Sequence, residues 1–468
     1  MLKRVDKPKV GLLICALLED EWNKTGYLRP AAQASVKTFT DALSSFAEVV
    51  CPGLVETEEQ AAQADLAFKQ AGVEAVIFTE IAYIQSLIPM RCLKQTQVPI
   101  IVWNTQAARF WPETADWDFV MLNSGLAGLP ETTHALTRSG RKFHIVTGHV
   151  DDKAALARLR RYCVAAAIAQ RLRWTTIGMV GHPYQYMADL MVDTYALRDK
   201  IGPTVKPIEL EDIAVATAAV TDDEAQALMA EAKAAWRTDE LDEFIFKQSA
   251  RCAAGLEKVV LGRNLDAVAH FDQALMADPR CGLCPSWGTS RLMGMGIPVT
   301  AEGDVNTCTA MLILNALAER SSFVENYGFD FDQGAAYVAH DSMGDPFLAA
   351  PEPRVALRHS VYYRGIYGMG AALEYAYKPG PVTMLALVQL DQGRWRLVAG
   401  EGESLPLKPR PTVAPQMLFR AAQSTIEAFY DAWCLAGSGH HCAFGYGHLG
   451  EDLRVLAEML GIEFELVR

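Results

Sequence analysis

The chain has 468 residues, enough for roughly two to four domains of ordinary size, each with its own buried core. Half of the residues are hydrophobic and 21% are charged, a balance that excludes disordered and fibrous proteins. The formal net charge of −13 has the wrong sign for holding nucleic acid or an anionic membrane surface, so we expect neither as a partner.

The cysteines and the first residues both bear on the cellular compartment. Ten cysteines are scattered along the chain, and only Cys281 and Cys284 have a metal-knuckle spacing, so we expect reduced thiols. Basic residues precede the apolar run 10–18, as in a signal peptide, but Glu19 follows at once without a cleavage site. We therefore expect a first β-strand there, no membrane-spanning helix and a cytoplasmic protein.

The first third of the chain alternates short apolar runs with helical patterns, which is typical of a parallel sheet with crossover helices. The expected strands are residues 10–15, 74–78, 99–103 and 143–147. A long helical pattern over residues 151–173 has apolar side chains on one face and arginines on the other. We predict that residues 1–173 form an N-terminal doubly wound α/β domain closed by this helix.

A second α/β unit follows. Residues 175–181 have the pattern of a strand that leads into a loop, and residues 266–271 have the pattern of another buried strand. Thr221 and Glu224 form a capping-box signature for the start of an alanine-rich helix that continues to Trp236. We predict a central domain over residues 174–320, again doubly wound around a parallel sheet.

The last third changes character. Residues 383–390, the turn 391–393 and residues 394–399 give a strong β-hairpin signal, and residues 334–340 and 354–361 have the pattern of further strands of one antiparallel sheet or barrel. Four prolines between residues 405 and 415 exclude regular structure, and we expect helices over residues 417–434 and 451–460. The predicted third domain covers residues 321–468.

Candidate functional residues follow several of the predicted strands, where open α/β sheets bind their ligands. Glu302 follows an expected strand over residues 296–301, Glu325 lies among aromatic residues, His340 ends a strand, and His440 and His441 lie in a glycine-rich loop. Two carboxylates and two or three imidazoles are typical of a site for an octahedral ion of the Mn²⁺ type. Two open positions on such an ion suit two vicinal oxygens of a polyol.

Several segments resemble the signature segments of the L-arabinose isomerase family, in the same order along the chain. They are residues 286–296 (SWGTSRLMGMG), 301–304 (AEGD), 323–327 (FVENY), 339–340 (AH) and 439–441 (GHH). Residues 104–106, 123–125 and 147–149 resemble segments of the wider L-arabinose and L-fucose isomerase group. The resemblance covers essentially the whole chain, and it implies two α/β domains followed by an antiparallel β-barrel domain with helices.

The resemblance implies a metal-dependent aldose–ketose isomerase that works through a cis-enediol. Glu302, Glu325, His340 and His441 match the four metal ligands, usually filled by Mn²⁺ with Mg²⁺ or Co²⁺ as alternatives, and the two glutamates match the proton-transfer residues. His440 could exchange roles with His441, and Asp330 is a reserve ligand. The family implies a homo-oligomer, a tetramer or hexamer, with sites built across subunit contacts.

Sugar recognition is less well defined. The family's Gln-x-Leu-Tyr-Gly segment, which contacts sugar in a neighbouring subunit, is replaced here by ALLEDEW at residues 16–22. The expected substrate is thus a pentose, a deoxyhexose or a modified sugar, and His149, His182, Trp287 and His440 are candidate substrate-binding residues. The alternatives are a metal-dependent epimerase, hydrolase or carbon–carbon enzyme acting on a sugar acid, and a non-catalytic sugar-binding protein.

Overall fold

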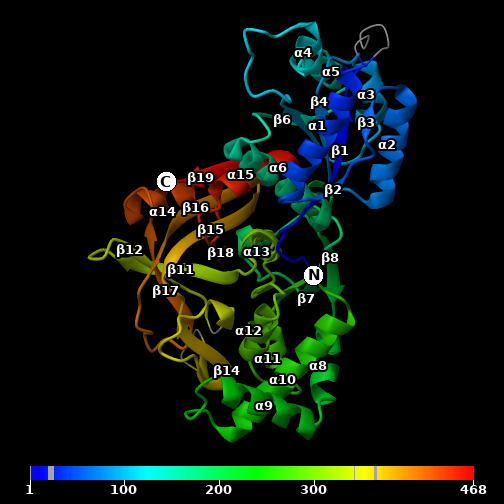
Figure 1. The fold of residues 1–468 in the computed structure, drawn as a ribbon. Coiled ribbons are helices and arrows are strands. Elements are labelled where there is room, and N and C mark those ends of the chain that lie inside the picture. Colours follow the sequence, from blue (N-terminus) through cyan, green and yellow to red (C-terminus); the bar gives the residue numbers. More distant parts are fainter. Residues whose placement is uncertain (1, 19–25, 342, 363–365) are drawn as a thin grey trace. The chain divides into compact units, whose positions relative to one another are not determined.

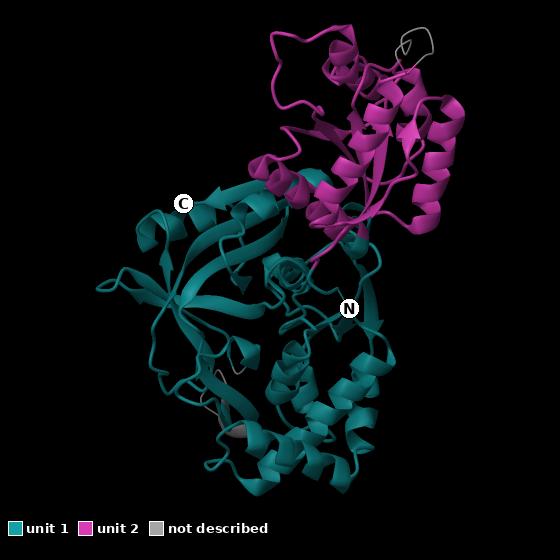
Figure 2. Cartoon of the chain, viewed as in Figure 1, with its two compact units in different colours: residues 1–4, 171–468 teal, residues 5–170 magenta. Residues whose placement is uncertain are grey.

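The computed structural model describes residues 2–18, 26–341, 343–362 and 366–468. The chain divides into two compact units, each described by itself: an N-terminal unit of residues 5–170, and a main unit of residues 1–4 and 171–468 (Figure 2). All ten cysteines are free. Among the described residues no helix is both long and apolar enough to cross a membrane.

The N-terminal unit is built on a parallel sheet with the strand order β2-β1-β4-β5-β6, in which β3 also pairs with β1 (Figure 1). The strands β1 and β4 are buried along nearly their whole length, as expected when both faces of a parallel sheet are covered. The strands are β1 (Lys9–Cys15), β2 (Glu48–Val50), β3 (Leu54–Val55), β4 (Ala75–Glu80), β5 (Ile100–Asn104) and β6 (Phe143–Thr147). The helices are α1 (Leu28–Ser44), α2 (Glu58–Ala71), α3 (Leu87–Leu93), α4 (Trp117–Leu122), α5 (Gly125–Arg138) and α6 (Lys153–Leu172).

The main unit begins with a second parallel sheet, in the order β10-β9-β7-β8. Thr221 caps α9 through the predicted capping box with Glu224. The strands are β7 (Thr176–Val180), β8 (Thr204–Ile208), β9 (Ala267–His270) and β10 (Val299–Thr300). The helices are η1 (Ala188–Leu190), α7 (Thr194–Lys200), α8 (Leu210–Ala218), α9 (Asp222–Ala235), α10 (Glu243–Gly262), α11 (Asp272–Ala277), α12 (Ser286–Gly294) and α13 (Val305–Ala318).

A nine-stranded mixed sheet completes the main unit, in the order β13-β14-β17-β12-β11-β18-β15-β16-β19. Because β16 also pairs with β17, the pairings from β17 to β16 return to their starting strand. The strands are β11 (Ser322–Asp330), β12 (Ala335–Ala339), β13 (Ala356–Tyr362), β14 (Ile366–Ala376), β15 (Gly380–Gln389), β16 (Trp395–Leu405), β17 (Pro415–Ala421), β18 (His441–Tyr446) and β19 (Glu463–Val467). The helices are η2 (Pro346–Leu348), η3 (Asp391–Gly393), α14 (Ile426–Leu435) and α15 (Gly450–Leu460).

Two expectations for the last third need correction. The helix expected over residues 417–434 is wrong in its first part, because residues 415–421 form β17 between β14 and β12 and pair with β16 as well. The third sheet is mixed and not purely antiparallel, because β14 pairs with β17 and β16 pairs with β19 in parallel. The predicted hairpin is confirmed, with η3 as its turn between β15 and β16.

One hydrophobic core joins the helices α9, α10 and α12 to the mixed sheet. Phe246 of α10 and Trp287 of α12 belong to the same buried cluster as Tyr375, Phe419 and Phe444 of the mixed sheet. The rings of Phe246 and Trp287 lie 5.5 Å apart. This shared core explains why residues 171–468 form one compact unit; the predicted division near residue 320 stays a prediction.

A buried carboxyl group lies at the end of β4 in the N-terminal unit. Glu80 is 3% exposed, and its Oε1 accepts a hydrogen bond of 2.6 Å from Thr132 Oγ1, whereas its Oε2 has no partner. Burial raises the pKa of Glu80 to about 8, against the lowering effect of the Thr132 hydrogen bond. The folded N-terminal unit therefore holds a proton on Glu80 at neutral pH.

We predict that Glu80→Gln changes how the stability of this unit depends on pH. Because the pKa is raised on folding, the wild-type group favours the folded state below its unfolded pKa, and this contribution is lost as the pH rises through about 8. Glutamine does not ionise, so its free energy of unfolding lacks this pH dependence. Between pH 5 and pH 9 the free energy of unfolding of the variant should therefore rise relative to that of the wild type by a few kcal/mol, at about 1.4 kcal/mol per pKa unit. Urea unfolding at pH 5, 7 and 9 measures this difference, and a difference that is constant with pH would contradict the prediction.

Candidate active site

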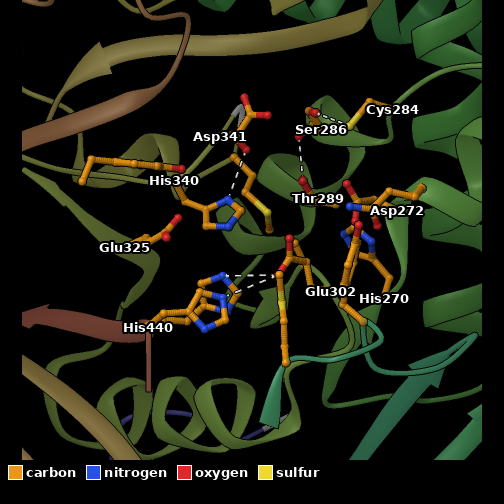
Figure 3. Close-up of a pocket in the computed structure, with 17 residues that line it drawn as sticks. His270, Asp272, Cys284, Ser286, Thr289, Glu302, Glu325, His340, Asp341 and His440 are labelled. Carbon is orange, nitrogen blue, oxygen red and sulfur yellow. Dashed lines mark hydrogen bonds and ion pairs between the residues drawn. The ribbon is translucent and has the colours of Figure 1, made fainter. Parts of the chain in front are cut away.

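A cavity of about 610 Å³ lies within the main unit (Figure 3). It is bordered by residues that follow strands of both sheets, which matches the expectation that functional side chains lie at strand ends. Its lining comprises Tyr184, Met187, His270, Asp272, Gln273, Cys284, Ser286, Thr289, Ala301, Glu302, Glu325, Tyr327, His340, Asp341, Met343, His440 and His441. Glu302, Glu325, His340, His440 and His441 are among them, so the structure brings together five of the residues singled out in the sequence.

The register of three neighbouring strands explains how Glu325, His340 and His441 meet. In the antiparallel pairs, Glu325 of β11 lies opposite Ala339 of β12 on one side and opposite His441 of β18 on the other. Side chains on directly opposed residues have Cβ atoms roughly 5 Å apart. His340 follows Ala339 immediately, so residues far apart in sequence become close neighbours. Phe323, two residues before Glu325, supports both imidazoles, with ring centroids 4.4 Å from His340 and 4.5 Å from His441.

Glu302 reaches the same cavity from the parallel sheet. The strand β10 is only two residues long, shorter than expected, because Glu302 and Gly303 have positive φ angles of 58° and 73° and turn the chain into α13. A Cβ on Gly303 would lie 2.7 Å from Pro183 Cα, so only glycine allows this close approach. The turn places Glu302 Oε2 3.6 Å from His440 Nε2 and 3.8 Å from His441 Nε2.

These side chains form two overlapping groups that could hold a metal ion. Glu325, His340 and His441 offer ligand atoms that all lie within 4.8 Å of one another, and so do Glu302, His440 and His441. His441 belongs to both groups. Glu302 Oε2 is buried without a hydrogen-bond partner, although a carboxylate oxygen removed from water normally has one. The unpaired oxygen and the neighbouring nitrogens form a donor set that suits a divalent cation.

Hydrogen bonds determine how two of these histidines are oriented. His340 Nδ1 lies 3.2 Å from the Asp341 carbonyl oxygen, which only accepts, so Nδ1 carries the proton and Nε2 keeps its lone pair. Burial, with the neighbouring His441, lowers the pKa of His340 well below its usual value. His441 Nδ1 lies 3.1 Å from Asp304 Oδ2, and Asp304 also caps α13 by accepting a hydrogen bond from Thr307 N. Both imidazoles therefore present Nε2, with its lone pair, as a nitrogen that can bind a metal ion.

His440 has different surroundings. Asp189 Oδ2 lies 2.6 Å from His440 Nδ1 and accepts a second hydrogen bond from the His440 backbone N–H at 3.0 Å. Burial lowers the pKa of His440, but the hydrogen bond to Asp189 and the nearby carboxylate of Glu302 outweigh it and raise the pKa to about 10. A Cβ on Gly439 would lie 2.8 Å from Asp189 Oδ2, so glycine is needed there for the contact. In the absence of metal, His440 is thus a cation.

Four other predicted residues lie elsewhere. Trp287 is 1% exposed and packs on the core, because its helix turns Ser286 and Thr289 toward the cavity instead. His182 is exposed, with its ring 4.5 Å from that of Phe271. The two that remain are His149, which belongs to the N-terminal unit with Nε2 3.3 Å from the Ala107 carbonyl, and Asp330, which accepts hydrogen bonds from Gln333.

A second group of cavity residues was not predicted from the sequence: His270, Asp272 and Gln273. They follow β9, a strand that was predicted, so the rule of searching strand ends could have found them. Burial lowers the pKa of His270 to about 4 and raises that of Asp272 to about 7. Figure 3 shows Glu302 between this group and the cluster of His340 and His440.

Comparisons with known proteins identify the family. Residues 29–173 match the L-arabinose isomerase N-terminal domain and residues 320–463 match the L-arabinose isomerase C-terminal domain, together more than half of the chain. The L-arabinose isomerase of Yersinia enterocolitica serotype O:8 is 26% identical over 385 residues, covering 79% of this chain and 76% of the relative. That of Yersinia pseudotuberculosis serotype O:1b is 25% identical over 387 residues, with the same coverage.

A match to a solved structure is much weaker. An ABC transporter solute-binding protein from Actinobacillus succinogenes 130z with bound D-allose is 12% identical and covers 62% of this chain and 83% of its own, with a TM-score of 0.16. That score supports no inference about fold or function. The two domain matches and the curated relatives lead to one conclusion: the chain belongs to the L-arabinose isomerase family and is an isomerase, an intramolecular oxidoreductase.

Proposed function

We propose that the protein is a metal-dependent aldose–ketose isomerase that acts on a pentose, a deoxyhexose or a modified sugar through a cis-enediol. The observation that carries the proposal is the register of β11, which sets Glu325 opposite His441 and beside His340, facing Glu302 across one cavity. The relatives named above are L-arabinose isomerases, which supports a small aldose as substrate. Residues 19–22 of the segment that departs from the family's sugar-contact motif lie outside the described residues.

The donor set fits a divalent ion of the Mn²⁺ type. Two carboxylates and two neutral imidazoles balance the charge of the ion and suit Mn²⁺, with Mg²⁺ and Co²⁺ as alternatives. We assign Glu302, Glu325, His340 and His441 as the ligands. Asp304 supports this choice because it orients His441 in the way that carboxylates commonly orient metal-binding histidines.

His441, and not His440, is the ligand in this proposal. An imidazole that carries a proton on both nitrogens has no lone pair for a metal. His440 is held in that form by Asp189, whereas His441 has one nitrogen bonded to Asp304 and the other directed at Glu302. His440 would instead donate hydrogen bonds toward Glu302 and to oxygens of the substrate.

The two glutamates carry the protons of the reaction. When bound, the metal polarises two vicinal oxygens of the sugar and stabilises the negative charge that develops on them. One carboxylate, Glu302 or Glu325, removes the proton from C2 and returns it to C1, while the other moves a proton from the C2 oxygen to the C1 oxygen. Acid–base groups positioned in this way contribute about 10²–10⁴-fold to a rate. The buried Phe323 beneath the imidazoles keeps water from that side.

The larger architecture is proposed on the same basis. The closed circuit of pairs from β17 through β12, β11, β18 and β15 to β16 would form the β-barrel of the family, with the domain boundaries near residues 173 and 320. A homo-oligomer, a tetramer or a hexamer, would complete the sugar pocket across subunits.

We predict that the protein with Mn²⁺ exchanges the C2 hydrogen of an aldose for deuterium in D₂O, within a panel of pentoses, deoxyhexoses and modified sugars. Glu302→Gln and Glu325→Gln should each lower the exchange rate by about 10²–10⁴-fold, because an amide cannot accept the proton. Asp330→Asn is the matched control, because Asp330 bonds to Gln333 and does not line the cavity. NMR follows the exchange, and unchanged rates in both glutamine variants would overturn the mechanism.

We predict that Asp304→Asn weakens Mn²⁺ binding by about 10–100-fold, the usual effect of losing an outer carboxylate. The asparagine can still cap α13 by accepting from Thr307 N, so the fold should be kept. Calorimetric titration with Mn²⁺ measures the affinity, and circular dichroism checks the helix content. Equal affinity in the two proteins would show that Asp304 does not orient His441.

We predict that Asp189→Asn lowers the pKa of His440 by several units in the metal-free protein. The hydrogen bond to Asp189 raises this pKa to about 10 against the effect of burial, so its loss lets burial dominate. NMR titration of the imidazole carbons gives the value directly. A pKa that stays near 10 in the variant would exclude Asp189 as the cause.

A further inference from the structure

One wall of the cavity, separate from the proposed metal ligands, contains buried polar atoms that have no hydrogen-bond partner. His270 is 2% exposed, and neither of its ring nitrogens has a hydrogen-bond partner. Asp272 Oδ1 and Gln273 Oε1 are likewise buried and unpartnered. Buried polar groups in folded proteins nearly always have partners. Three residues with unpartnered polar atoms within four positions of the chain, all on one cavity wall, therefore indicate that a ligand supplies the missing hydrogen-bond partners.

The other polar side chains near this wall are already satisfied. Cys284 Sγ lies 2.9 Å from Ser286 Oγ, and Thr289 Oγ1 donates a hydrogen bond of 2.7 Å to the Ser286 carbonyl. The open hydrogen-bonding capacity of this wall therefore belongs to residues 270–273. Local geometry explains why they face the cavity together: β9 ends at His270, Phe271 turns the other way to pack against His182, and Asp272 begins α11.

The unpartnered atoms of this wall are hydrogen-bond donors and acceptors that hydroxyl groups can pair with. The carboxylate oxygen of Asp272 and the amide oxygen of Gln273 accept hydrogen bonds, while the neutral imidazole of His270 offers one donor and one acceptor. A hydroxyl both donates and accepts, so it can pair with all three, whereas an ammonium group would leave the His270 donor unpaired. Among the described residues that line the cavity there is no lysine or arginine, and the cationic His440 is already paired with Asp189, which disfavours an anionic ligand.

We propose that His270, Asp272 and Gln273 form a hydroxyl-binding subsite that holds the part of the sugar beyond the two reacting carbons. The proposal rests on the function proposed above, because Glu302 lies between this subsite and the histidine cluster and so places the reacting carbons beside it (Figure 3). Asp272 is the specificity-determining residue, since its buried Oδ1 has no partner in the protein and can accept a hydrogen bond from a hydroxyl of the sugar.

Binding of pentitols tests the subsite without requiring turnover. Ribitol, arabinitol and xylitol are titrated into the Mn²⁺-loaded full-length protein by calorimetry, and into the Asp272→Ala and Gln273→Ala variants. We expect at least one pentitol to bind, and its affinity to fall at least 10-fold in Asp272→Ala, with Mn²⁺ affinity unchanged. Cys284→Ser is the matched control, because serine on the same wall can keep the bond to Ser286.

The outcomes separate this proposal from the proposed function. Pentitol binding that depends on Asp272, together with no deuterium exchange on any aldose, would support the subsite and refute the isomerase. Exchange that is normal in Asp272→Ala and Gln273→Ala, with an unchanged KM and unchanged pentitol affinity, would refute the subsite and leave the isomerase standing. Failure of the wild type to bind any of the three pentitols would also refute the subsite.

Discussion

The candidate site depends on one antiparallel register. A shift of one residue between β11 and its neighbours would turn Glu325 to the other face of the sheet and separate it from both histidines. The register is held by apolar burial on the same strand, because Phe323 and Val324 are fully buried and Phe323 packs against His340 and His441. Core packing and site geometry are therefore the same constraint on this strand.

Asp304 links Glu302, which comes from the parallel sheet, to the candidate ligands of the mixed sheet. This residue ends the turn that presents Glu302, caps α13 and bonds to His441 of β18. One side chain thus connects the parallel sheet to the mixed sheet at the point where the two groups of candidate ligands meet. The hydrophobic core that α9, α10 and α12 share with the mixed sheet supports this link, because these elements cannot move apart without exposing it.

Sequence patterns predicted the strands β1, β4, β5, β6, β7 and β9 closely, because buried parallel strands are continuous apolar runs with clear boundaries. The error at residues 417–421 has a physical cause: a short apolar run is compatible with either structure, and pairing of β17 with three other strands decided it. The resemblance to the family brought out Glu302, Glu325, His340 and His441. No local spacing rule could have given their convergence, since it depends on strand pairing across up to 116 positions of the chain.

Two kinds of site residue were not predicted from the sequence: those that form hydrogen bonds to other site residues, and those at the end of β9 that line the cavity. Asp189 and His440 are 251 positions apart, and the hydrogen bond between them, which affects the pKa of His440, forms only in the folded chain. The wall of His270, Asp272 and Gln273 has a further significance. At residues 16–22 the chain departs from the motif that the resemblance gives as the family's sugar contact. Under the proposed function the hydroxyl groups of the sugar therefore need other partners, and the unpartnered atoms of this wall are suited to bind them. In the proposed function, the candidate metal ligands would fix the reaction while the wall of residues 270–273 would select which sugar reacts.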